Sequence, residues 1–459
     1  MAVEASGSVV SGEGRRDPSP TIPLTRTERV ASIDVLRGVA VLGILLMNIP
    51  GFGMPFAFLD VPVEPGGNTG ANLWVWAANS VLFAGKMRAI FSMLFGAGVL
   101  VLTSRLEDRG AGIETADIYL RRLLWLVIFG LVHAYFIWWG DILFFYGVIG
   151  LFLFPFRKLS GRTLIIAGIV VLLVHVGREW VFHARTMERT RADAVAADTA
   201  AAAGATPTSE QKAAQESWAN RLKQAHPAPE ALEKEIAAYR GSYLDALRER
   251  AGFLSREQAN ALYSFFFLDA GGMMLLGMGL FKLGFLSAAG ARHIYWIVAA
   301  VGFALGLPLA AWAVRGAVTS GFDPVTMAYG DVVRAAARVP IALAHVAVVM
   351  LICQAGILGG LTRRLGAVGQ MAFSNYILTS LICTTVFYGY GVGLFGYLQR
   401  YQIYYVVAAV WLVQLVVSPI WLRHFRFGPL EWLWRSLTYL ERQPLLIRAT
   451  KPVTEPATV

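Results

Sequence analysis

The sequence predicts an all-α fold, a polytopic integral membrane helical bundle of about ten transmembrane helices with one long extracytoplasmic loop. Hydrophobic residues make up 56% of the 459 residues and charged residues only 15%, whereas a soluble domain carries about 25% charged residues. The apolar residues gather in runs of about the length that spans a bilayer. Basic residues, which give a net charge of +10, recur in short groups between these runs. This pattern excludes a soluble enzyme, a secreted disulfide module and a nucleic-acid-binding domain.

The apolar runs define the expected elements in order. After a polar segment, 1–28, that we expect to be a disordered cytoplasmic tail, ten stretches have spanning length: 33–53, 76–103, 121–139, 141–156, 163–185, 262–286, 293–314, 338–359, 369–394 and 402–422. Only Trp138–Asp141 separates the third stretch from the fourth, which predicts a tight helical hairpin. Lys86 and Arg88 interrupt the second stretch, and the fourth is short for a span.

The long hydrophilic segment divides the protein into two membrane regions. We expect a five-helix region at 29–185, an extracytoplasmic loop at 186–261, a second five-helix region at 262–442 and a cytoplasmic tail at 443–459. Within the loop, the spacing of charged and apolar residues over Pro229 to Arg250 predicts one or two helices outside the membrane. A break is expected near Ala200–Pro207.

Lys and Arg in the short connections predict the orientation. They concentrate in every second connection and at both ends of the chain, with members such as Arg105, Arg122, Arg157, Lys158 and Arg435. Short loops rich in Lys and Arg stay in the cytoplasm. Both termini are therefore expected to be cytoplasmic, which agrees with an even number of spans.

One group of polar residues is expected near the cytoplasmic side. Asp34 and Arg37 are three residues apart at the start of the first span, so they share a helix face and can pair. Lys86 and Arg88 lie on the second stretch, and Asn375 lies near the start of the ninth. Ionisable residues within spans are candidates for function. Interfacial ion pairs and anchors to the membrane surface are the alternative interpretation.

A second group is expected near the outer side, and it contains Asn48, His133, Asp141 and Asp269. His133 ends the third stretch and Asp141 begins the fourth, so the hairpin can bring them together. A histidine beside a carboxylate is the usual general base with its orienting partner. The alternative is a hydrogen bond that only fixes the hairpin.

Other kinds of site find no support in the sequence. No cluster of His, Cys, Asp and Glu has the spacing of a metal site, and neither a Walker loop nor a dinucleotide fingerprint is present. Cys353 and Cys383 lie in apolar stretches and are expected to pack without reacting. The glycine pairs at 96/98, 271/272 and 277/279 are expected to allow close helix contacts.

Five motifs in order resemble the YeiB-like bacterial membrane proteins. They are the opening Arg29–Ile44 with Ser-Ile-Asp34-Val-Leu-Arg37-Gly, Lys86–Gly98 (KMRAIFSMLFGAG), Arg121–Tyr146 with His133 and Gly140-Asp141, Gly369–Tyr376 (GQMAFSNY) and Gly428–Tyr439 (GPLEWLWRSLTY). The C-terminal half resembles the domain of unknown function numbered 418. The resemblance implies a multi-pass protein of the bacterial inner membrane.

The opening motif also resembles the transmembrane acyltransferase group that includes the lysosomal heparan-glucosaminide N-acetyltransferase. This resemblance implies transfer of an acyl group from cytoplasmic acyl-CoA to an acceptor across the membrane. That group places a catalytic His in the loop after the motif-bearing span. Here the corresponding loop, Ile49–Asn72, contains no His, and His133 is expected at the same outer level.

Two main hypotheses for function follow. In the first, a membrane acyltransferase binds acyl-CoA as a co-substrate near Arg37. His133 with Asp141 then deprotonates a carbohydrate or lipid acceptor or accepts the acyl group itself, and Asn48 or Lys86 stabilises the oxyanion. No resident cofactor, metal or nucleic acid is expected, and the lipid bilayer is the implied partner. In the second, ten spans divided into five and five carry a small metabolite across the membrane. A sensory or assembly role for the long loop is a third possibility.

Overall fold

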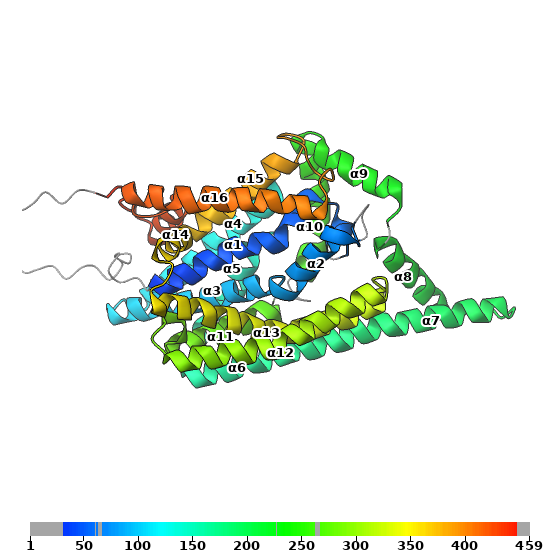
Figure 1. The fold of residues 1–459 in the computed structure, drawn as a ribbon, viewed down its shortest axis with the longest axis horizontal. Coiled ribbons are helices and arrows are strands. Elements are labelled where there is room, and N and C mark those ends of the chain that lie inside the picture. The colour runs from blue at the N-terminus through cyan, green and yellow to red at the C-terminus, as the bar shows by residue number, and fades with distance from the viewer. Residues whose placement is uncertain (1–30, 60, 63–66, 226, 262–266, 448–459) are drawn as a thin grey trace, which may run out of the picture.

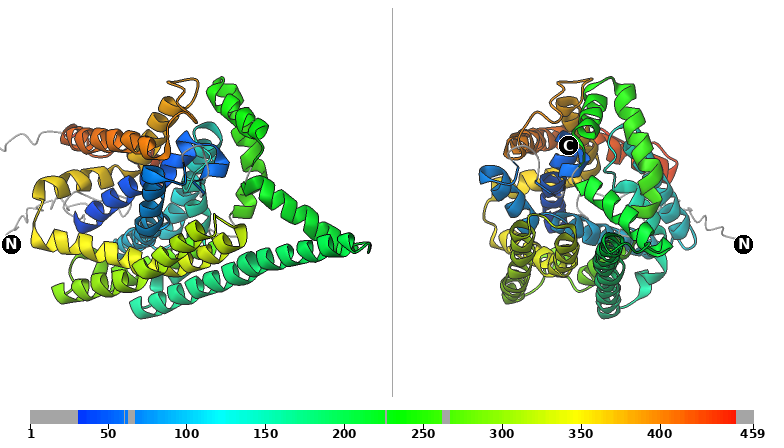
Figure 2. Two further views of the ribbon diagram at one scale, coloured as in Figure 1. Left: turned by 45° about the vertical axis from the view of Figure 1, so that its right-hand side comes forward. Right: turned by 90° about the vertical axis from the view of Figure 1, so that its right-hand side faces the viewer.

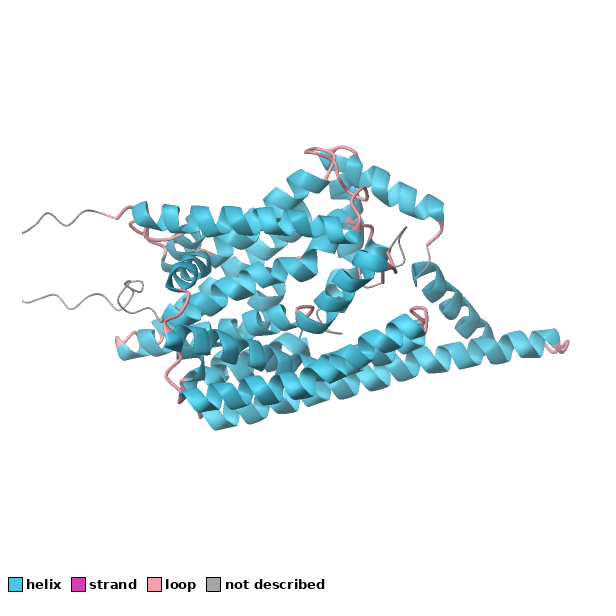
Figure 3. Ribbon diagram, viewed as in Figure 1, coloured by secondary structure: helices cyan, strands magenta, loops and turns pink. Residues whose placement is uncertain are grey.

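The fold is a bundle of helices, and no strand occurs among the residues described (Figure 3). The computed structural model describes residues 31–59, 61–62, 67–225, 227–261 and 267–447. The expected tail at 1–28, the start of the sixth apolar stretch and most of 443–459 lie outside these ranges. The first ten helices are α1 (Ala31–Gly53), α2 (Gly70–Leu82), α3 (Lys86–Asp108), α4 (Glu114–Phe136), α5 (Leu143–Leu151), α6 (Gly161–Arg178), α7 (Arg185–Ala202), α8 (Ser209–Ala225), α9 (Pro229–Arg240) and α10 (Tyr243–Ala261).

The C-terminal half continues with seven more helices. They are α11 (Phe267–Lys282), α12 (Arg292–Thr319), α13 (Pro324–Ala355), α14 (Gly359–Gln370), α15 (Ala372–Phe387), α16 (Arg400–His424) and α17 (Pro429–Tyr439). Short 3-10 turns lie at Phe56–Phe58, Phe154–Lys158 and Phe285–Ser287. The start of α1, α14 and α17 lie at one end of the bundle, and α8 and α9 lie at the other (Figure 1).

Six helical segments are long and apolar enough to cross a membrane among the residues described. They are Ala31–Gly53, Gly70–Asp108, Gly161–Ala202, Arg292–Thr319, Pro324–Ala355 and Arg400–His424. The outer helices α6, α12 and α16 expose apolar side chains such as Leu173, Leu305 and Leu412. Exposed aliphatic side chains at this density suit lipid contact. The structure thus supports a membrane protein, and the count of ten spans remains a prediction.

The second apolar stretch is not one straight helix. It breaks between α2 and α3, where Gly85 has a φ of +76° that favours glycine. The Lys86 amine donates to the carbonyl of Ser80 at 2.6 Å across this break. The ninth stretch also breaks, since α14 and α15 meet at Met371, and its last residues form an irregular segment after Phe387.

The long loop is mostly helical. The boundary expected at 185/186 is not a structural break, because α6 continues through a π-helical turn, Glu179–Ala184, directly into α7. The non-helical segment between α7 and α8 confirms the break expected near Ala200–Pro207. The segment Pro229–Arg250 forms two helices, α9 and part of α10. Figure 2 shows α7 and α8 projecting beyond the bundle.

Close helix contacts hold the bundle together where glycines remove the side chain. A Cβ on Gly369 of α14 would lie 1.9 Å from the carbonyl oxygen of Asp34 on α1, and a Cβ on Gly277 of α11 would lie 2.1 Å from that of Met93 on α3. Gly96 approaches the Met274 carbonyl oxygen as closely, at 2.0 Å, and Gly272 and Gly279 approach side chains at 2.7 and 2.6 Å, as predicted. Gly98 has no such neighbour within 4 Å, and Gly271 makes only an ordinary contact at 3.6 Å. Such contacts are how helices associate in lipid.

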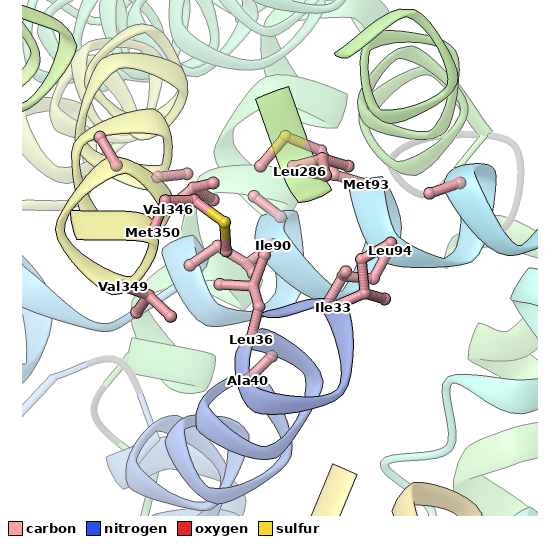
Figure 4. Close-up of a cluster of buried hydrophobic side chains, with 14 of the residues drawn as sticks. Ile33, Leu36, Ala40, Ile90, Met93, Leu94, Leu286, Val346, Val349 and Met350 are labelled. Carbon is pink, nitrogen blue, oxygen red and sulfur yellow. The ribbon is translucent and has the colours of Figure 1, made fainter. Parts of the chain in front are cut away.

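The largest apolar core joins the two halves of the chain. It contains Ile33 and Leu36 of α1, Ile90 of α3 and Val346 and Met350 of α13, whose side chains point toward one another in Figure 4. This core fixes the start of α1 against the centre of the bundle. Asp34 and Arg37, which share that turn, are therefore held in a defined position.

Candidate functional site

The end of α4 and the loop after it bring His133 and Asp141 together, which confirms the predicted contact. Nδ1 of His133 lies 2.9 Å from Oδ1 of Asp141, and both side chains are buried. The other carboxylate oxygen, Oδ2, accepts a hydrogen bond from the Phe144 amide at 2.7 Å, at the start of α5. An imidazole whose Nδ1–H is held by a carboxylate offers the lone pair of Nε2 as a base.

Local sequence explains why the hairpin is so tight. A Cβ on Gly130 would lie 2.2 Å from the Phe144 amide nitrogen and 2.8 Å from Oδ2 of Asp141, so glycine lets α4 and α5 touch. Trp138 anchors the loop to α1, because its indole NH donates to the Gly51 carbonyl at 3.1 Å and its ring stacks on Phe52. The hairpin is thereby rigid at the residues that carry the imidazole.

Ser380 completes this group, and sequence reasoning missed it. Its hydroxyl oxygen lies 2.9 Å from Nε2 of His133, on the side of the ring opposite Asp141. The same oxygen is 3.4 Å from the Tyr376 carbonyl one turn earlier on α15, a longer contact. We call His133, Asp141 and Ser380 the His133 cluster. In the sequence, Ser380 stands out only because it lies one turn after Tyr376, the last residue of the motif GQMAFSNY. That position does not show which helix Ser380 faces.

A cavity of about 270 Å³ opens near the end of the bundle that holds α17. Five arginines and two carboxylates line it, and they include the predicted residues Asp34 and Arg37. The charged residues of the lining are Asp34, Arg37, Arg105, Arg109, Arg122, Glu431 and Arg435. Its deeper wall is apolar and aromatic, with Phe91, Tyr146 and Tyr376. We call this space the arginine-lined cavity. It combines a cationic entrance with an apolar interior.

Several contacts fix the entrance of this cavity. Arg37 donates to Asp34 at 3.1 Å, which confirms the predicted pair. Arg122 stacks over the ring of Trp434 at 3.8 Å from its centroid, which ties α4 to α17. The Glu431 carboxylate accepts hydrogen bonds from the amides of Phe373 and Ser374, so it caps the first turn of α15.

The His133 cluster lies beyond the inner wall of the arginine-lined cavity. The ring of Tyr376, which lines the cavity, has its centroid 5.0 Å from that of His133. The Tyr376 hydroxyl donates to the Gly140 carbonyl and accepts from the Ile142 amide, both at just over 3 Å. One aromatic side chain therefore separates the cavity from the imidazole.

A smaller pocket of about 150 Å³ lies on the other side of the cluster. Glu235 of α9, Glu249 of α10 and the rings of Phe56, Trp139 and Phe253 line it. We call it the glutamate-lined pocket. Trp138 connects it to the cluster, since its ring centroid lies 6.4 Å from His133 and 5.3 Å from Trp139. Burial, with Glu249 as a lesser cause, raises the pKa of Glu235 to about 7, although the Phe56 amide donates to it.

A second polar cluster lies among α3, α6, α11 and α13, and we call it the Asp269 cluster. Asp269 pairs with Arg88 at 2.8 Å and with Arg338, and Nε2 of His175 is 3.9 Å from the same carboxylate. The prediction had grouped Asp269 with the outer residues around His133. The structure instead places it with Arg88, because α11 packs between α3 and α6.

The remaining predicted residues do not join the His133 cluster. The Asn375 amide donates to the Val368 carbonyl and the Ser418 hydroxyl, which ties α15 to α14 and α16. Lys86 is buried and bonds to Ser80, as described above. Asn48 is partly buried on α1, and among the residues described no hydrogen bond joins it to His133.

Comparison with known proteins gives relatives over nearly the whole chain. The family model described as "Protein of unknown function (DUF418)" matches residues 280–441. The "Uncharacterized protein YxaH" of Bacillus subtilis is 30% identical over 447 residues, which cover 92% of this chain and 97% of the relative. The "Uncharacterized protein YeiB" of Escherichia coli is 29% identical over 448 residues, covering 92% and 100%. No solved structure gives a significant match.

Proposed function

The chain belongs to the YeiB-like family, and we propose that it is a membrane acyltransferase that moves an acyl group from acyl-CoA at the arginine-lined cavity to an acceptor at the opposite end of the bundle. The single observation that carries this proposal is the position of the His133–Asp141 pair. It lies one aromatic ring away from a cavity with a cationic entrance and an apolar interior.

The cavity suits an acyl donor that has an anionic head and an apolar tail. Five arginines at the entrance would contact the phosphates of acyl-CoA, because guanidinium groups bind phosphate oxygens through paired hydrogen bonds. The acyl chain would then lie against Phe91, Tyr146 and Tyr376. This arrangement directs the thioester toward the end of the cavity nearest His133.

The His133 cluster supplies the base that acyl transfer requires. Asp141 holds Nδ1 of His133, so that Nε2 can accept a proton from a nucleophile. The glutamate-lined pocket, on the far side of Trp138, offers the acceptor a separate entry. With Lys and Arg marking the cytoplasmic side, the donor would enter from the cytoplasm and the acceptor from outside.

Binding and transfer measured together test the proposal. Purified full-length protein would be titrated with labelled acetyl-CoA and longer acyl-CoAs, and acyl-CoA consumption would be followed with envelope carbohydrates and lipids as acceptors. Arg37→Ala should weaken donor binding by roughly tenfold, whereas His133→Ala should bind normally and transfer nothing. Arg363→Ala is the matched control, since Arg363 lies outside the residues that line the cavity. Transfer by His133→Ala at the wild-type rate would refute the proposal.

Transport of a small metabolite is the second candidate, favoured by one observation. The buried Asp269 lies between Arg88 and Arg338 inside the bundle, and buried charges of this kind mark ion and substrate pathways in transporters. Substrate flux in proteoliposomes without acyl-CoA consumption, abolished by Asp269→Asn and not by His133→Ala, would favour this function over acyl transfer.

A further inference from the structure

We propose that Ser380 is a catalytic nucleophile that carries the acyl group as an ester between two half-reactions. This inference rests on the proposed function and specifies its chemistry. It follows from the hydrogen-bonded order Asp141, His133, Ser380, in which both contacts measure 2.9 Å and all three side chains are buried. An orienting carboxylate, an imidazole and a hydroxyl in this order form the arrangement that activates serine in acyl transfer on unrelated folds.

The separation of the two cavities is the reason to expect a covalent intermediate. Tyr376 lines the arginine-lined cavity and Trp139 lines the glutamate-lined pocket, and the His133 cluster lies between them. A donor and an acceptor in these two spaces do not meet. A thioester that reaches past Tyr376 can load Ser380, and the acceptor can then remove the acyl group from the other side, so that donor and acceptor need not occupy the cluster at the same time.

The first half-reaction loads the serine. As the hydroxyl oxygen of Ser380 attacks the thioester carbon, its proton moves to Nε2 of His133, and a carbon–oxygen bond forms. The carbon–sulfur bond then breaks, and His133 gives the proton to the departing CoA thiolate. The products are the acyl ester of Ser380, neutral His133 and CoA with a free thiol. Asp141 stabilises the imidazolium that forms between these steps without itself taking the proton.

The second half-reaction reverses these steps, with the acceptor in place of CoA. His133 accepts the proton of an acceptor hydroxyl or amine, whose oxygen or nitrogen bonds to the acyl carbon. The ester bond to Ser380 breaks, and His133 returns the proton to the serine oxygen. The sum is transfer of one acyl group from sulfur to the acceptor, with no redox change and no further reactant.

A purely structural hydrogen bond between α4 and α15 is the competing explanation, so the test needs a readout that packing alone does not change. Full-length protein would be incubated with acetyl-CoA without any acceptor. Transfer of label from added free CoA, labelled in its CoA part, into acetyl-CoA would be measured. The quenched protein would also be analysed by peptide mass spectrometry. Such exchange is the signature of a two-step mechanism.

We expect wild-type protein to exchange label and to carry one acetyl group on the peptide that contains Ser380. Ser380→Ala should lose both signals. Ser380→Cys should carry the acetyl group as a thioester, which hydroxylamine removes faster than an ester. Thr384→Val is the matched control, because it deletes another buried hydroxyl of α15, one that donates to the Leu381 carbonyl; it should behave as wild type.

Three results would overturn the inference. Acyl transfer by Ser380→Ala at the wild-type rate would show that the serine is not needed. An acetyl group on His133 instead of Ser380 would assign the covalent role to the imidazole. Donor binding without exchange or adduct would remove the covalent step and leave the proposed function standing, whereas loss of donor binding in wild-type protein would remove both.

Discussion

The Asp269 cluster and the His133 cluster are both buried in the bundle, but they differ in charge and in surroundings. The first pairs a carboxylate with two guanidinium groups from α3 and α13. The second joins a carboxylate, an imidazole and a hydroxyl through two hydrogen bonds, next to residues that line two cavities. Burial of charge alone therefore does not identify a reaction centre. Paired full charges fix helices, whereas a hydrogen-bonded chain that can relay a proton, in contact with residues that line a cavity, is suited to chemistry.

The largest expected effect on stability comes from the Asp269 cluster. Asp269→Ala removes the buried carboxylate that pairs with Arg88 and Arg338, and breaking a buried ion pair in this way costs about 3–5 kcal/mol. Thermal unfolding of the purified protein would measure the change. Asp117→Ala is the control, because its pair with Arg121 is exposed and should contribute less than about 1 kcal/mol. Equal melting temperatures for the two variants would contradict the structural role.

A substitution in the His133 cluster should have the opposite result, a loss of activity with little loss of stability. Asp141→Asn keeps an oxygen for the Phe144 amide but no longer holds the reactive tautomer of His133. Acyl transfer should fall by about 10³- to 10⁴-fold, while the melting temperature changes little. If Asp141→Asn is destabilised as much as Asp269→Ala, or transfers acyl groups at the wild-type rate, the inferred difference between the two clusters is wrong.

The packing of α1 against α14 offers a smaller test of how the cavity is built. Gly369→Ala places a methyl group against the Asp34 carbonyl, and overpacking of this kind costs about 1–3 kcal/mol. Because Asp34 and Gly369 line the arginine-lined cavity, donor binding should weaken as well. Gly177→Ala is the control, since a Cβ on Gly177 would meet no atom within 4 Å and Gly177, on α6, lies outside the residues that line the cavity. Unchanged donor binding by Gly369→Ala would show that the close contact between α1 and α14 does not shape the donor site.

The smallest expected effect lies at Glu235, whose pKa of about 7 exceeds its ordinary value because of burial. The folded state therefore holds this proton between about pH 4.5 and 7, and stability falls as pH rises through that range. Glu235→Gln should raise the melting temperature relative to wild type at pH 8 and have little effect at pH 4. Glu233→Gln, on the exposed face of α9, should show no such difference.

The sequence predicted the helical membrane fold, the Asp34–Arg37 pair and the His133–Asp141 contact, because each depends on residues close together in the chain. Hydropathy and helical spacing report such local relations. Ser380 lies 247 residues from His133 and Asp269 lies 181 residues from Arg88. Contacts over such separations depend on how helices pack, which one sequence does not record. The sequence also showed that Lys86 and Arg88 interrupt the second stretch, but hydropathy did not show that the helix itself breaks there, at Gly85.

Locating the bound acyl donor tests the proposed function most directly. An acyl-CoA with a photoreactive group at the end of its acyl chain would be bound to the full-length protein, irradiated, and the labelled peptides identified by mass spectrometry. We expect label on α15 around Tyr376 and on α5 around Tyr146, which line the arginine-lined cavity, and loss of that label when unlabelled acyl-CoA competes. Label on α11 or α13 around Asp269 and Arg338, with none on α15, would place the donor at the Asp269 cluster and contradict the proposed function.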